Sequence, residues 1–222
     1  MKYFIGLLFI ILSYNYSFSQ SNSYFTFSNK VLFYDFSDIN YKSGNDYPDL
    51  ENFAIRYSLG KQYIGKKGAF GLNLSYLYNN NSNVKKKIMF QGYEISSNFE
   101  YNILFSKDFQ IYPLVEFGFN KYDIILTEDQ VGGFSIFDIL NKSIPNYTLS
   151  NIGYFIDFGL GMKYFFDIWI YKLGIGINSG YRINFDNKWK YNNINRISDS
   201  VAKTNGFYIG FNFYVNLMKR KI

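Results

Sequence analysis

Apolar and polar side chains alternate along most of the chain after residue 20. From Phe207 to Leu217 every odd position is apolar, and the even positions are Tyr, Gly or Asn. Residues 152–164 and 169–183 also alternate, with the apolar residues at the even positions of the first run and at most odd positions of the second. Successive side chains of a β-strand point to opposite faces, whereas a helical pattern repeats every 3.6 residues or so. The alternation therefore predicts an all-β chain.

Eight runs of this kind can be marked, and most are long. They cover residues 23–35, 51–63, 67–79, 87–105, 109–126, 151–165, 168–185 and 205–218. A tilted strand needs about 9–11 residues to cross a bilayer, and most of the runs reach or exceed that length. A strand of a typical globular protein has only about 5–6 residues.

The connections between these runs alternate in length. Three are tight, at residues 64–66, 106–108 and 166–167, and four are longer and polar, at residues 36–50, 80–86, 127–150 and 186–204. Short turns on one side and long loops on the other are typical of outer-membrane barrels. We therefore expect an eight-stranded antiparallel up-and-down transmembrane β-barrel. The even strand number places both ends of the mature chain on the periplasmic side.

The two rows of each strand differ in a way that favours lipid outside and polar groups inside. Eleven of the 18 glycines fall on the polar rows, where a narrow lumen has room only for small residues. Aromatic residues gather near the ends of the apolar rows, as in the girdles at the membrane interfaces. Two charges, Lys61 and Lys121, lie on the apolar rows near strand ends, where long side chains reach the headgroups.

The polar rows also carry a balanced set of charges. These are Arg56, Lys163, Lys172 and Arg182 against Glu94, Glu100, Glu116 and Asp157. Counting from the tight turns places Glu116 beside Asn98 and near Glu100, with Arg56 or Lys172 as the base that faces them. An ion or proton path is one interpretation. A structural network is favoured, because side chains fill the interior of an eight-stranded barrel.

The first 20 residues read as a targeting segment rather than as part of the fold. Lys2 precedes an apolar stretch over residues 4–12, and small residues follow at Ser17 and Ser19. This order matches a signal peptide with its cleavage site. We expect residues 1–20 to be removed on export, residues 21–222 to form the barrel, and the mature protein to reside in the outer membrane of a Gram-negative bacterium.

Composition narrows the possible chemistry. The chain has no Cys and no His, so Cys-ligated and His-ligated metal sites and Ser-His or Cys-His nucleophiles are excluded. No cofactor is expected, and the chain is not expected to be an enzyme. The net charge of +6 becomes about +5 once Lys2 is removed with the targeting segment, and this mild excess on an exported barrel indicates contact with anionic lipid headgroups rather than with nucleic acid.

Taken together, the rows and turns resemble the small eight-stranded outer-membrane proteins of the OmpA/OmpX type. More narrowly, the chain is similar to porin-family outer-membrane barrels, which include PorT-like proteins linked to type IX secretion. The resemblance implies a non-enzymatic membrane anchor or contact surface, with other envelope or secretion proteins as partners. Passage of small hydrophobic molecules and an adhesin-like surface role are the alternatives.

Two of the long loops carry side chains suited to contact with a partner. The loop at 127–150 contains the apolar residues Phe134 and Phe137, and the loop at 186–204 contains Trp189, Tyr191 and Arg196. Apolar residues in such loops indicate either partner contact or packing against the barrel rim.

Overall fold

The computed structural model describes residues 22–43, 47–83, 86–106, 108–128, 147–169, 171–185, 189–191, 195–196 and 202–216. The side chains of Lys42, Glu128, Tyr191, Asn195 and Arg196 are not described. The predicted signal peptide lies outside these residues.

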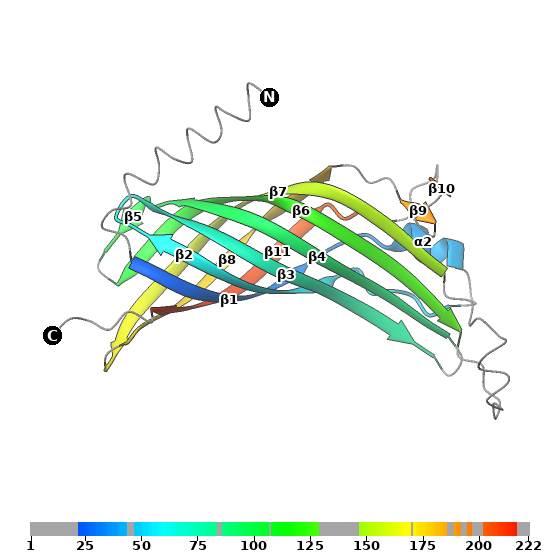
Figure 1. Ribbon diagram of the computed structural model, residues 1–222, viewed down its shortest axis with the longest axis horizontal. Helices are drawn as coiled ribbons and strands as arrows, with labels where there is room; N and C mark the ends of the chain where they lie inside the picture. Colours follow the sequence, from blue (N-terminus) through cyan, green and yellow to red (C-terminus); the bar gives the residue numbers. More distant parts are fainter. Residues whose placement is uncertain are drawn as a thin grey trace, which may run out of the picture.

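Eight long strands form one closed antiparallel barrel (Figure 1). They are β1 (Asn22–Leu32), β2 (Ala54–Ile64), β3 (Gly68–Ser82), β4 (Lys86–Tyr101), β6 (Phe109–Glu128), β7 (Tyr147–Ile168), β8 (Tyr171–Phe185) and β11 (Gly206–Asn216). Each strand pairs with the next in this order, and β11 pairs with β1 from Phe25↔Val215 to Leu32↔Tyr208. The predicted fold class is confirmed.

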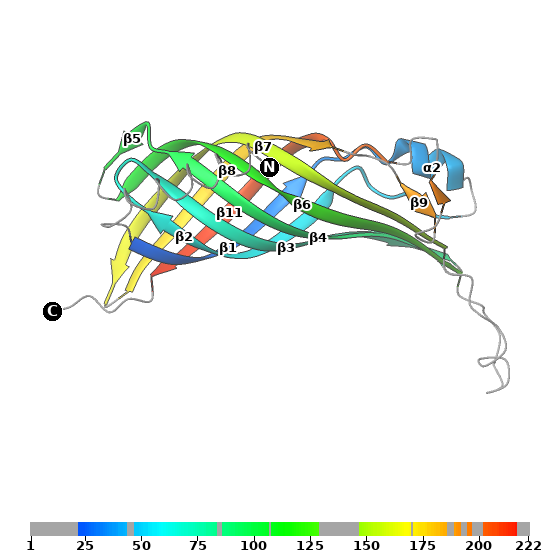
Figure 2. The ribbon, with the colours of Figure 1, turned by 45° about the horizontal axis from the view of Figure 1, so that its top comes forward.

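The two ends of the barrel differ. The β2–β3, β4–β6 and β7–β8 connections lie at one end, which we name the turn end, together with β5 (Leu104–Phe105). The opposite, loop end carries α2 (Ser37–Ser43), β9 (Lys190–Tyr191) and β10 (Asn195–Arg196) (Figure 2). At this end β7 runs past β8, which pairs only from Tyr154 onward. No helix among the described residues is long and apolar enough to cross a membrane.

The alternating rows face the directions that the sequence predicts. Phe211 and Ile175 are 58% and 47% exposed on the outer wall, whereas Asp157 and Arg182 are fully buried inside. Inner glycines make room for inner rings: a Cβ on Gly161 would lie 2.6 Å from the Tyr112 ring. The outer wall is thus apolar and the interior polar, which is the arrangement that a membrane-spanning barrel requires.

The turn between β7 and β8 lies further along the chain than expected. The predicted turn at 166–167 is wrong, because β7 continues to Ile168, which pairs with Tyr171. Trp169, which follows β7, adopts a positive φ of 53°. A two-residue hairpin turn needs positive φ, which Gly or Asn normally supplies. Neither residue occurs here, so the sequence carries no signal for the turn.

The predicted run at 87–105 is interrupted near the turn end. β4 ends at Tyr101, and the separate strand β5 pairs with β6 through Leu104↔Ile111. Asn102 lies between them, and its side-chain amide donates to the main-chain oxygens of Gly65 and Lys66, both at 3.2 Å. The Asn102 side chain therefore ties the neighbouring β2–β3 turn to this break.

The connection at 36–50, predicted as a polar loop, instead supplies apolar side chains to the interior. Phe36, Ile39 and Leu50 are buried against the inner faces of the strands at the loop end. Asn40 holds the segment in place: its side-chain amide donates to the Leu50 oxygen and accepts from the Leu50 N–H, both at 2.9 Å. We name the buried apolar cluster that contains Phe36, Ile39 and Leu50 the loop-end plug.

Candidate functional site

Six charged side chains from six strands meet inside the barrel and form what we name the central ionic cluster. They are Lys30 (β1), Arg56 (β2), Glu94 (β4), Glu116 (β6), Asp157 (β7) and Arg182 (β8). Each is 4% exposed or less. Three cations face three anions, so the cluster has no net charge when all six are ionised. Buried charges persist in proteins when they are paired and hydrogen-bonded in this way.

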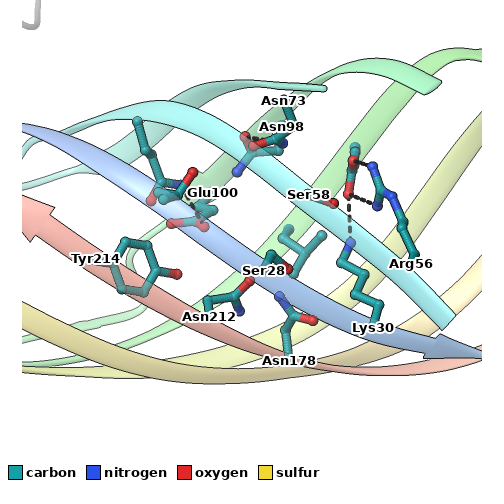
Figure 3. Close-up of a pocket in the computed structure, with 14 residues that line it drawn as sticks. Ser28, Lys30, Arg56, Ser58, Asn73, Asn98, Glu100, Asn178, Asn212 and Tyr214 are labelled. Atoms are coloured by element: carbon teal, nitrogen blue, oxygen red, sulfur yellow. Dashed lines mark hydrogen bonds and ion pairs between the residues drawn. The ribbon is translucent and has the colours of Figure 1, made fainter. Parts of the chain in front are cut away.

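Glu116 accepts from two cations. Lys30 Nζ lies 2.6 Å from Glu116 Oε2, and Arg56 Nη2 lies 2.5 Å from Oε1 (Figure 3). The Ser96 hydroxyl donates to the same Oε1 at 2.6 Å. The register that places Glu116 opposite Asn98 is the predicted one, and Arg56 is one of the two bases that the sequence suggests.

Arg182 joins the other two carboxylates. It donates to Asp157 through Nε at 2.7 Å and Nη2 at 3.0 Å, and its Nη1 lies 2.5 Å from Glu94 Oε1. Arg56 Nε lies 2.8 Å from the other oxygen of Glu94. The Arg182 guanidinium also stacks 3.8 Å from the centroid of the Phe155 ring. Glu94 therefore bridges the two arginines, and the cluster is continuous across the lumen.

A second charge pair lies nearer the turn end. Lys163 is bonded to Glu100, and Gln62 donates to Glu100 Oε1 at 2.8 Å. Beyond this pair the barrel is filled by a small cluster of buried apolar and aromatic residues: Tyr24, Ile64, Ala69, Phe165 and Tyr214. The lumen is thus obstructed at three levels, by the loop-end plug, by the central ionic cluster and by this turn-end cluster.

A polar cavity of about 40 Å³ lies between the two charged groups. Figure 3 shows Ser28, Asn178 and Asn212 on one side of it and Asn73 and Asn98 on another. One water molecule needs about 10–15 Å³ of such space, so the cavity suits a few waters at most.

The carboxylates of the central ionic cluster are engaged with cations. A general acid and base must face a substrate, whereas Glu94 and Glu116 face arginines. No group of three or more potential metal ligands occurs among the described residues.

The eight charged residues predicted for the lumen do not form a single network in the structure. Arg56, Glu94, Glu116, Asp157 and Arg182 meet in the central ionic cluster, and Lys163 and Glu100 form the separate pair. Lys172 lies apart at the turn end, 3.7 Å from Asp108.

Sequence reasoning did not single out Lys30, which belongs to the cluster. It lies on the inner row of β1, but the outward residue next to it is Asn29 rather than an apolar side chain. Three consecutive polar residues, 28–30, therefore hide the alternation that would have marked Lys30.

The structure tests only some of the contact residues predicted in the loops. Trp189 is wrong as an exposed contact, because it is 1% exposed and packs in the loop-end plug. Tyr191 and Arg196 are placed by their backbones in β9 and β10, and their side chains lie outside the description. Phe134 and Phe137 lie outside the described residues.

No family model and no curated protein matches the chain. Three solved structures are similar over most of its length. Neisserial surface protein A is 12% identical with a TM-score of 0.48, over 87% of this chain and 97% of that one. The attachment invasion locus protein Ail of Yersinia pestis is 11% identical with a TM-score of 0.43, over 87% and 98%. A major outer membrane protein of Thermus thermophilus is 11% identical with a TM-score of 0.39, over 86% and 98%. At these values the likeness adds nothing to what the strand pairing shows.

Proposed function

We propose that the chain is an integral outer-membrane β-barrel that conducts nothing and holds a contact surface at its loop end. The observation that carries the proposal is the division of the strands into an apolar outer row and a polar, charge-paired inner row. A water-soluble barrel would place its apolar row inside, because exposed apolar rows of this extent drive association. The signal-peptide pattern supports export to the outer membrane.

The filled lumen supports an anchoring role over a channel. Among the described residues, side chains fill the barrel at three levels, and the central ionic cluster spans its middle. Passage of small hydrophobic molecules finds no support in a lumen whose middle holds six charges. We also propose that the protein is not an enzyme, since its buried carboxylates are engaged with cations.

The loop end supplies the contact surface. The long β6–β7 hairpin extends beyond β8, and α2 lies beside the barrel mouth (Figures 1 and 2). Tyr41 on α2 is 88% exposed. An adhesin-like role and a role as accessory of a secretion complex, including a PorT-like one, both use a surface of this kind, and both remain part of the proposal.

Labelling of single cysteines in intact cells tests the location and the orientation. The chain contains no Cys, so Tyr41→Cys at the loop end and Ser106→Cys at the turn end each introduce one thiol. We expect a maleimide attached to a polymer too large for porins to label Tyr41→Cys in intact cells. It should label Ser106→Cys only after the outer membrane is permeabilised. Labelling of Ser106→Cys alone in intact cells would reverse the orientation, and labelling of neither variant before lysis would refute the surface location.

Planar-bilayer recording tests the lack of conduction. The purified protein is expected to give no steps above those of protein-free bilayers. Reproducible conductance steps that change in Glu116→Gln would contradict the sealed lumen.

A further inference from the structure

The wall of the polar cavity inside the barrel carries polar atoms without a partner. Four side-chain atoms that line it make no hydrogen bond within the part of the chain that the structure describes: Ser28 Oγ, Gln62 Oε1, Asn178 Oδ1 and Asn212 Nδ2. Gln62 is 2% exposed, and Asn178 and Asn212 are each 7% exposed. Proteins satisfy nearly all such buried groups, either with protein atoms or with ordered water, because an unpaired polar atom is costly to bury.

These four atoms come from four neighbouring strands. Ser28 of β1 lies opposite Asn212 of β11 in the strand register, and Asn178 of β8 lies on the same side of the cavity (Figure 3). Gln62 of β2 borders the cavity as well, and its amide nitrogen donates to Glu100 Oε1 at 2.8 Å. Three of the four atoms are oxygens that accept hydrogen bonds, whereas Asn212 Nδ2 is a donor. An occupant that satisfies all four must therefore both donate and accept.

The size and the charges of the cavity limit the occupant further. Its volume of about 40 Å³ has space for about three water molecules, at about 10–15 Å³ for each. Lys30 and Arg56 on the wall disfavour a bare cation. Glu100 and Glu116 on the same wall disfavour an anion. Water is neutral, fits the volume, and both donates and accepts hydrogen bonds.

We propose that the polar cavity is a binding site for about three ordered water molecules, held by the four unpartnered atoms of its wall. Glu116 of the central ionic cluster and Glu100 of the second charge pair both border the cavity, so the waters lie between the two charged groups and complete the hydrogen bonding of the interior there. Among the described residues, the loop-end plug and the turn-end cluster fill the lumen on either side. Exchange of these waters with bulk solvent is therefore slow.

Magnetic relaxation dispersion of oxygen-17 water counts such long-lived waters in the folded protein in detergent micelles. We expect about three for the unmodified chain. Asn178→Leu replaces a lining amide by an apolar side chain of similar size, and it should lower the count by at least one. Asn29→Leu is the matched control, because Asn29 is exposed on the outward row of β1, and it should leave the count unchanged.

Absence of long-lived water from the unmodified chain would overturn the proposal, and this measurement needs no variant. An equal count in Asn178→Leu and Asn29→Leu would overturn it as well. Asn212→Leu removes the unpartnered donor and provides a second test if Asn178→Leu does not fold, with the same decrease expected. A count that changes with the concentration of sodium, potassium or chloride would identify a bound ion instead and would refute the water site.

Discussion

At the residue scale, the central ionic cluster makes individual charges costly to remove. Glu116 pairs with both Lys30 and Arg56, and its carboxylate lies inside the barrel. Removal of one partner from a buried pair leaves an uncompensated charge, which costs about 3–5 kcal/mol. Replacement of both partners by apolar groups is much less harmful.

Glu116→Gln should therefore destabilise the barrel by about 3–5 kcal/mol. Denaturant unfolding in lipid vesicles, followed by Trp fluorescence, measures the loss. Asp108→Asn is the control, because its partner Lys172 lies 3.7 Å away in a partly exposed pair, where less than about 1 kcal/mol is expected. Lys30→Met added to Glu116→Gln should restore part of the stability. Equal losses in Glu116→Gln and Asp108→Asn would show that the cluster is not desolvated.

The ion-pair partners inside the lumen were predictable only in part, because the sequence gives the strand register and the face on which a side chain lies and nothing more. Turn-anchored counting places Glu116 opposite Asn98 and offers Arg56 or Lys172 as its base, and the structure pairs it with Arg56. It also assigns Lys172 to the lumen, but Lys172 lies one residue from the start of β8 and reaches Asp108 instead. Row parity says which way a side chain points, whereas the strand tilt decides the level at which it meets others.

At the element scale, the β7–β8 hairpin combines an unusual backbone with an exposed ring. Trp169 has a positive φ of 53° and is 95% exposed. This backbone conformation is unfavourable for a bulky side chain. β7 continues four residues beyond Tyr164, the last residue that pairs with β6, and Ile168 and Tyr171 flank the turn with exposed apolar side chains. Trp is enriched where membranes meet water, so we expect Trp169 to lie in the inner-leaflet interface.

The fluorescence of Trp169 checks this placement. The chain has only two Trp, so Trp189→Phe leaves Trp169 as the single emitter. In vesicles its emission should be shifted to the blue and quenched most by lipids brominated near the headgroup. Trp169→Phe is the control, since Trp189 is buried and should respond weakly to both brominated lipid and acrylamide. Water-like emission of Trp169 with full acrylamide quenching would place the turn away from the membrane.

A strand could be predicted well where its apolar and polar residues alternate clearly, and poorly elsewhere. The strand order and the apolar rows of β7, β8 and β11 are confirmed, since one face of each strand meets the barrel interior and the other the exterior. The inward packing of residues 36–50 was not predictable, because Phe36, Ile39 and Leu50 are spread among polar residues with no strand period. The same holds for Trp189, whose burial depends on tertiary contacts.

At the scale of the whole molecule, the fold is a barrel with an apolar outer wall and an interior filled by side chains. The outer wall supplies no polar partner for the backbone, and the pairing of β11 with β1 completes the ring of eight paired strands. The interior holds its charges as neutral groups and seals both ends with apolar clusters. Anchoring and orientation both depend on the outward direction of the apolar rows.

Spin-label accessibility along β11 measures that direction most directly. Single cysteines at each position from Gly206 to Asn216 carry the label, and collision rates with oxygen and with a water-soluble nickel chelate are recorded in vesicles. We predict high oxygen accessibility at residues 207, 209, 211 and 213, and low accessibility to both reagents at the even positions. Accessibility of the odd positions to the nickel chelate in preference to oxygen would show that the apolar rows face water, and would contradict the membrane-spanning barrel.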